Sequence, residues 1–121
     1  MDYLVASISM LALDAIYLKA TLPFFSSMIK SIQNQPLKTK PMSFVAVYVL
    51  MLFGLYTLIL SKKRTPYEAF ILGLLVYGVF ELTNYTIFRN WSIFPVVFET
   101  LWGGILFYLT TWITYFVAKH V

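Results

Sequence analysis

Cysteine is absent from the 121 residues, and histidine occurs once, as the penultimate residue His120. Without cysteine the chain can form no disulfide, no thiolate metal site and no cysteine nucleophile. Haem proteins, zinc hydrolases and membrane di-iron enzymes need imidazole ligands, which one terminal histidine cannot supply. The sequence also contains no Gly-rich phosphate loop and no G-x-S-x-G turn. We therefore expect no catalytic residue of these classes, no metal site and no cofactor.

Charge is scarce as well, because charged residues make up 12% of the chain and hydrophobic residues 60%, with a mean hydropathy of +0.79. So few charges could not cover the surface of a soluble protein of this size. The composition predicts an integral membrane protein in contact with the lipid bilayer. Its net charge of +4 comes from residues near the ends of apolar stretches, a pattern typical of headgroup contact, and we expect no nucleic-acid partner.

Four apolar stretches are each long enough to cross a bilayer, which takes about 20 residues. We expect transmembrane helices at about residues 3–22, 43–60, 67–88 and 95–118. The predicted fold class is all-α: a polytopic membrane protein whose four transmembrane helices form an antiparallel bundle. The bundle occupies residues 1–121 as a single domain.

Prolines mark the expected helix boundaries. Pro41, Pro66 and Pro95 each stand where a first helical turn accepts a residue without an N–H group. Pro23 is expected to end or kink the first helix. Residues 24–33 would then form a short amphipathic helix in the headgroup plane or a plain loop.

Basic residues divide equally between the two sides of the membrane, so the positive-inside rule gives little guidance. The side of the first and third connections has Lys30, Lys38, Lys40 and Arg89, and the side of the termini has Lys62, Lys63, Arg64 and Lys119. Lys19, near the end of the first span, favours a cytoplasmic first connection at residues 23–41.

Three of the five acidic residues, Asp14, Glu81 and Glu99, lie within expected spans. A charged group facing lipid at mid-depth costs about 3 kcal/mol or more, so these side chains should face the bundle interior. At the helical rise they lie roughly 13, 12 and 6 Å from the same side of the membrane. We therefore expect them to converge in one half of the bilayer as a binding site or a proton or ion pathway.

Polar and small residues at helical spacing surround the three acids. Asn84 would orient a ligand, and Arg89 would supply a counter-charge. The expected supporting residues are Tyr17, Thr83, Tyr85, Trp91, Trp102 and Gly103. Each acid also has a structural explanation: Glu81 and Asn84 would form an interhelical pair, Glu99 would be a solvated acid at a helix start, and Asp14 would pair with Lys19 or Arg89.

Three motifs, "LALDAIYL" (11–18), "FELTNYTIFRNW" (80–91) and "ETLWGG" (99–104), resemble a four-helix membrane-protein family catalogued as domain of unknown function 2177. The resemblance spans nearly the whole chain and implies a four-helix membrane fold without an established activity. Relatives usually carry basic residues in the first connection, which implies that this loop is cytoplasmic. The residues that match the family motifs are Asp14, Glu81, Leu82, Thr83, Asn84, Arg89, Trp91, Glu99, Trp102 and Gly103.

The chain departs from the family motifs at four positions. Glu81 and Glu99 stand where the family has aspartate, Tyr17 replaces a tryptophan, and Asn90 replaces a glycine. The carboxylate chemistry is kept, while the reach of two acids is one methylene longer.

These patterns leave three hypotheses open. The first is a small membrane protein, homo-oligomeric, whose interior acids bind or conduct a cation, a proton or a small polar solute. The second is a structural or accessory membrane protein whose acids only pair helices. The third is a lipid-modifying enzyme, in which paired acids at headgroup depth perform acid–base chemistry.

Overall fold

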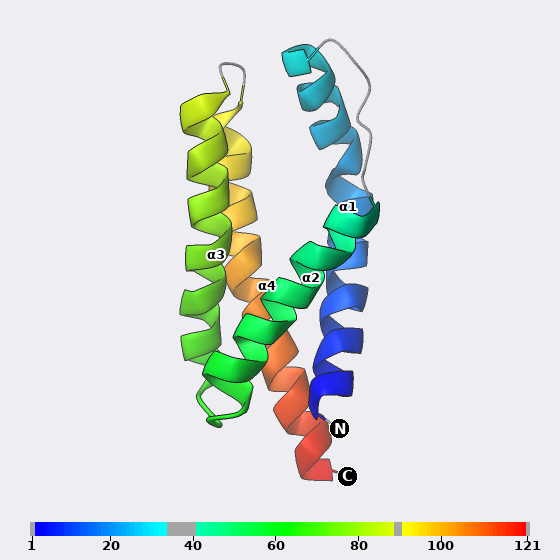
Figure 1. Ribbon diagram of the computed structural model, residues 1–121, viewed down its shortest axis with the longest axis vertical. Helices are drawn as coiled ribbons and strands as arrows, with labels where there is room; N and C mark the ends of the chain where they lie inside the picture. Colours follow the sequence, from blue (N-terminus) through cyan, green and yellow to red (C-terminus); the bar gives the residue numbers. More distant parts are fainter. Residues whose placement is uncertain (1, 34–40, 89–90, 121) are drawn as a thin grey trace.

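The computed structural model describes residues 2–33, 41–88 and 91–120. These residues form α1 (Asp2–Gln33), α2 (Pro41–Leu55), a π-helical continuation η1 (Tyr56–Leu60), α3 (Pro66–Ile87) and α4 (Ile93–His120). The chain runs up and down through the four helices, so that both termini lie at one end of the bundle (Figure 1). The predicted all-α four-helix fold is confirmed.

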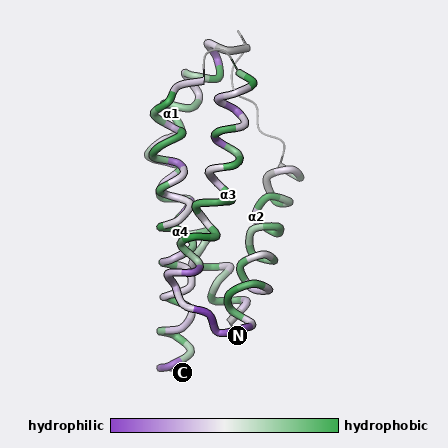
Figure 2. Tube along the Cα trace, turned by 90° about the vertical axis from the view of Figure 1, so that its left-hand side faces the viewer, coloured by the Kyte–Doolittle hydropathy of each residue, from purple (hydrophilic) through white to green (hydrophobic). Residues whose placement is uncertain are grey.

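Three of the described helices are long and apolar enough to cross a membrane, namely α1, α3 and α4. The apolar part of the second helical segment, Val45–Leu60, is shorter. It crosses the bundle diagonally and covers only part of the length of α1 and α3 (Figure 1). Hydrophobic residues follow most of each helix, and a hydrophilic segment marks the turn between α2 and α3 (Figure 2).

We had expected Pro23 to end or kink the first helix. It does not end the helix, because α1 continues through it to Gln33. The fixed φ of proline is itself helical, and its cost is one missing hydrogen bond to the carbonyl of Lys19. At the helical rise, 32 residues extend about 48 Å, which exceeds the thickness of the hydrocarbon core. Residues 24–33 are therefore the last part of α1 and form neither a separate amphipathic helix nor a loop.

Helices α3 and α4 pack most extensively against each other, through glycines (Figure 1). A Cβ atom on Gly73 would lie 2.9 Å from the Cα atom of Gly104 and would overlap the carbonyl group of Gly103. A Cβ atom on Gly103 would in turn overlap Tyr77. Small residues let membrane helices approach closely and gain van der Waals contact. Buried residues line α4, which makes it the central helix of the bundle.

The start of α3 is fixed by a capping box. The Thr65 hydroxyl accepts a hydrogen bond from the backbone N–H of Glu68, and the Glu68 carboxylate accepts one from the backbone N–H of Thr65. Pro66 occupies the first turn, as its position in the sequence predicts. Arg64 also contacts the Glu68 carboxylate at 2.9 Å. A cap of this kind contributes about 1 kcal/mol.

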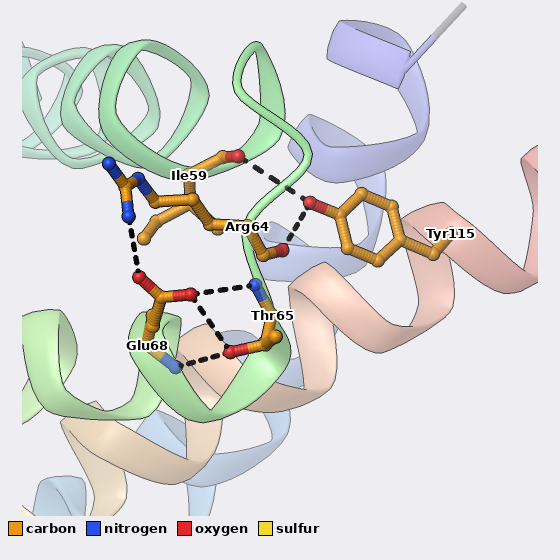
Figure 3. A network of polar contacts seen from close by, with 5 residues as sticks. All are labelled: Ile59, Arg64, Thr65, Glu68 and Tyr115. Atoms are coloured by element: carbon orange, nitrogen blue, oxygen red, sulfur yellow. Dashed lines mark hydrogen bonds and ion pairs between the residues drawn. The ribbon is translucent and has the colours of Figure 1, made fainter.

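Tyr115 ties α4 to the turn between α2 and α3. Its hydroxyl donates to the carbonyl oxygen of Arg64 at 2.6 Å and approaches that of Ile59 at 3.5 Å (Figure 3). Ile59 belongs to the π-helical turn, whose wider hydrogen bonding joins the N–H of Ser61 to the carbonyl of Tyr56. The hydrogen bonds of Tyr115 therefore hold α4 against the end of η1, where the backbone departs from α-helical geometry.

Candidate functional site

Asp14 lies in the middle of α1 and is 5% exposed. Its carboxylate accepts hydrogen bonds from the Tyr48 hydroxyl of α2 and, at 2.9 Å, from the indole N–H of Trp102 on α4. Because no water is present in the hydrocarbon core, a polar group at this depth must find its partners within the protein. One carboxylate thus connects three helices.

Tyr17, one turn after Asp14, stacks on the Trp102 ring with centroids 4.6 Å apart and planes 6° from parallel. The Tyr17 hydroxyl is buried and has no hydrogen-bond partner. It lies beside the Glu99 carboxylate. The stacked rings therefore place an unpaired hydroxyl among the acids.

Glu81 is the most deeply buried acid, at 1% exposed. Its carboxylate accepts a hydrogen bond from the indole N–H of Trp91 at 3.1 Å. Trp91 lies between α3 and α4 and contacts the rings of Phe88 and Phe25. A residue outside the helices thus supplies the hydrogen-bond partner of Glu81. The ring contacts of Trp91 bring Phe25 of α1 and Phe88, which follows α3, to this end of the site.

Glu99 is 8% exposed and lies in the second turn of α4. It is not a solvated acid at a helix start, because α4 begins at Ile93 and the side chain turns into the bundle. Asp14, Glu81 and Glu99 line one cavity of about 360 Å³. Three helices therefore bring one carboxyl group each to a common space.

The cavity lies beside the beginning of α2, where Val47 and Tyr48 also line it. Because α2 is short and crosses diagonally, it does not cover the adjacent parts of α1 and α3 (Figure 1). The cavity therefore follows from the length and tilt of one helix.

Among the described residues, no lysine or arginine forms an ion pair with the three acids. The ion pair found among the described residues joins Arg64 and Glu68, which lie outside the cavity. Lys19 is exposed, and the partners of Asp14 are Tyr48 and Trp102 instead. Arg89, the expected counter-charge, lies outside the described residues.

The three acids are spread along the cavity. Within the described ranges, no group of three histidine, cysteine or acidic side chains is close enough to hold a metal ion. The site therefore offers separate carboxyl groups to a ligand of some length.

A comparison with known families assigns the chain. The model of the family described as "Predicted membrane protein (DUF2177)" matches residues 1–116. The chain belongs to this family. No curated protein and no solved structure matches it. Membership, together with the long apolar helices, makes this a multi-pass membrane protein.

The other residues that the sequence predicted as part of the site lie in different environments. Asn84 is half-buried and forms no hydrogen bond with Glu81, so the expected interhelical pair is not formed in the described structure. Thr83 and Tyr85 are exposed, and the Thr83 hydroxyl donates to the carbonyl of Val79 in its own helix. Gly103 packs against Tyr77, where it brings α3 and α4 together.

Tyr48 is the site residue that sequence reasoning missed. It lies in an apolar stretch whose other members carry no charge, so nothing nearby in the sequence marks it. One signal was available: a tyrosine hydroxyl inside a membrane span needs an acceptor, and buried tyrosines usually find one. Asp14 is that acceptor.

Proposed function

We propose that this membrane protein binds a cation or a small polar solute in the cavity, with Asp14, Glu81 and Glu99 as its polar ligands. The observation that supports the proposal is their common position: three buried carboxyl groups from three helices line one space of about 360 Å³. Ligand pockets in proteins begin at about this size and carry a few polar groups on apolar walls.

The balance of charge supports a positively charged ligand. No described lysine or arginine neutralises the three acids. A carboxylate buried without a counter-charge is costly, so a bound cation or a proton stabilises the site. Hydrogen bonds from Tyr48, Trp91 and Trp102 hold the Asp14 and Glu81 carboxyl groups in place, and these described partners add no positive charge to the site.

Conduction across the membrane is the further step of this proposal. Four helices enclose little volume, so a continuous path forms more easily between two copies of the chain. We therefore propose that the transporting form is a homo-oligomer, with Asn84 and Arg89 near the path as orienting group and counter-charge.

Neutralising the acids one at a time tests the proposal. Asp14→Asn and Glu81→Gln keep an acceptor oxygen for the tryptophan N–H groups and remove the charge. We expect both variants to fold and to lose binding and flux of protons, Na⁺ and methylammonium in proteoliposomes. Wild-type activity in both variants would contradict the proposal, as would absence of binding by the wild-type protein.

Glu68→Gln is the matched control for this experiment. It makes the same carboxylate-to-amide change at a half-exposed position outside the cavity. Glutamine also serves in a capping box. We expect this variant to bind and conduct as the wild type does.

A second candidate is a structural role, which one observation favours. The Asp14 carboxylate joins α1 to α2 and α4 through two hydrogen bonds, and such bonds contribute to helix association in membranes. This candidate predicts that Asp14→Asn lowers thermal stability and that the wild-type protein binds none of the three probes.

A further inference from the structure

The walls around the three acids are apolar and largely aromatic. Rings from α1, from α3 and from the segment before α4 line the cavity: Phe25, Tyr77, Phe80 and Trp91. Aliphatic side chains fill much of the remaining wall. An apolar surface stabilises an apolar part of a ligand by about 25 cal/mol per Å² of contact. These walls thus favour a ligand with a hydrophobic body.

Separated carboxyl groups suit an organic cation better than a metal ion. Because no three of the described acidic side chains converge on one point, a small inorganic ion could meet few protein oxygens here. An organic ammonium group is weakly hydrated when it carries carbon substituents. It is also attracted by aromatic faces, which contribute about 0.5–2 kcal/mol at such sites.

The cavity opens sideways toward the bilayer. Leu22, Val47 and Phe80 line it and yet are 48%, 52% and 59% exposed. They belong to α1, α2 and α3, whose outer surfaces face lipid in a membrane protein. A hydrophobic ligand dissolved in the bilayer can therefore enter between these helices without crossing water.

An unpaired hydroxyl gives an independent indication of a missing polar partner. The Tyr17 hydroxyl is buried without a hydrogen bond, next to Glu99. A buried polar group without a partner costs about 1–3 kcal/mol. Glu99 lines the cavity and Tyr17 does not, so a ligand would meet this hydroxyl only beside Glu99.

From these four observations we infer that the ligand class is a lipophilic organic ammonium, whose charged head meets the carboxyl groups and whose apolar body contacts Phe80 and its neighbours. This inference rests on the proposed function and specifies its substrate. The ligand enters from the membrane phase, head toward Asp14 and Glu81.

Three probes of matched structure test the inference on the full-length protein in detergent, with protein-free micelles subtracted. Phenylbutylamine carries both a charged head and an apolar body, methylamine carries the head alone, and phenylbutanol carries the body alone. We expect phenylbutylamine to bind at least about tenfold more tightly than methylamine, which is the effect of burying one phenyl group. We also expect it to bind more tightly than phenylbutanol, because only the amine carries a positive charge to the carboxyl groups. Glu81→Gln should reduce the difference between phenylbutylamine and phenylbutanol, which depends on the charge of the carboxyl groups.

A pair of wall variants tests the position of the apolar body. Phe80→Ala should weaken phenylbutylamine binding several-fold and leave methylamine binding unchanged. Phe94→Ala removes another exposed ring, which does not line the cavity. This variant should leave the binding of phenylbutylamine and of methylamine unchanged. Because both side chains are exposed, neither substitution should unfold the protein.

Each outcome separates the inference from the proposed function. If methylamine or Na⁺ binds as tightly as phenylbutylamine, the inference is wrong and the proposed cation site stands. If phenylbutanol binds as tightly as phenylbutylamine, charge plays no part and both are wrong. If none of the three probes binds, the inference is wrong, and the proteoliposome assays with protons and Na⁺ decide separately whether the proposed function stands.

Discussion

Among the residues that the structure describes, each buried acid of this protein interacts with an aromatic side chain and none with a basic one. Asp14 accepts from a tyrosine and a tryptophan, Glu81 accepts from Trp91, and Glu99 lies beside Tyr17. Indole and phenol groups bring a single donor on a large apolar ring, so they satisfy a carboxylate within lipid without adding charge. The site therefore remains electrically open to a cation.

At this scale the Trp102 hydrogen bond can be tested alone. Trp102→Phe removes the indole N–H that contacts Asp14 and keeps a ring to stack on Tyr17. We expect the free energy of unfolding to fall by about 1 kcal/mol, the usual contribution of one such bond. Thermal unfolding of the purified protein, followed by circular dichroism, measures the change.

Trp112→Phe is the control. Trp112 is exposed and stacks on Phe116, and it is not a partner of the acids. We expect this variant to match the wild type within about 0.5 kcal/mol, as surface substitutions do. Equal losses in both variants would mean that ring size, and not the hydrogen bond, supports the site.

At the scale of the elements, the α3–α4 pair is the rigid part of the fold and α2 is the element that leaves space. Glycines bring α3 and α4 into backbone contact, whereas α2 crosses the bundle on a tilt (Figure 1). Because Glu81 and Glu99 belong to the tightly packed pair, their positions are fixed relative to each other. The separation between α2 and this pair sets the width of the cavity.

The close approach of α3 and α4 predicts a large effect for one added methyl group. In Gly73→Ala the new Cβ would overlap backbone atoms of Gly103, which cannot rotate away. We expect the free energy of unfolding to fall by about 1–3 kcal/mol, the range seen for overpacked cores. The denaturation midpoint in detergent measures this loss.

Gly54→Ala provides the comparison within α2, where a Cβ atom meets open space. Alanine is the better helix former, so we expect no loss and a gain of up to about 1 kcal/mol. A Gly73→Ala variant as stable as Gly54→Ala would show that the two helices can separate at no cost.

At the scale of the whole molecule, the antiparallel order of the helices places both termini and the α2–α3 turn at one end of the bundle (Figure 1). The acid cavity belongs to the other half, toward the first and third connections. Orientation therefore decides from which compartment or leaflet the site is approached. We predict that the first connection is cytoplasmic.

The absence of native cysteine permits a direct test of this orientation. Ser31→Cys at the end of α1 and Lys62→Cys in the α2–α3 turn both create exposed thiols. A membrane-impermeant maleimide applied to intact cells should label Lys62→Cys, and Ser31→Cys only after permeabilisation. The reverse pattern would invert the predicted topology and place the cavity in the outer leaflet.

Local chemistry made much of the fold predictable. Hydropathy indicated four apolar stretches, and Pro66 marked the start of α3. Pro23 misled the prediction, because the tolerance of a helix for one proline depends on its surroundings and not on the residue alone. The tilt of α2 was equally invisible, since a helix's tilt depends on its neighbours.

The sequence by itself determined the membrane class, the number of helices and the position of Asp14, Glu81 and Glu99 within apolar segments, because length and hydropathy act along one chain segment at a time. Only the tertiary structure decided that Tyr48, Trp91 and Trp102 are partners of these acids and that the acids share one cavity. The physical reason is rotation: the direction in which a helix presents each side chain follows from packing against other helices, above all the glycine contact of α3 with α4.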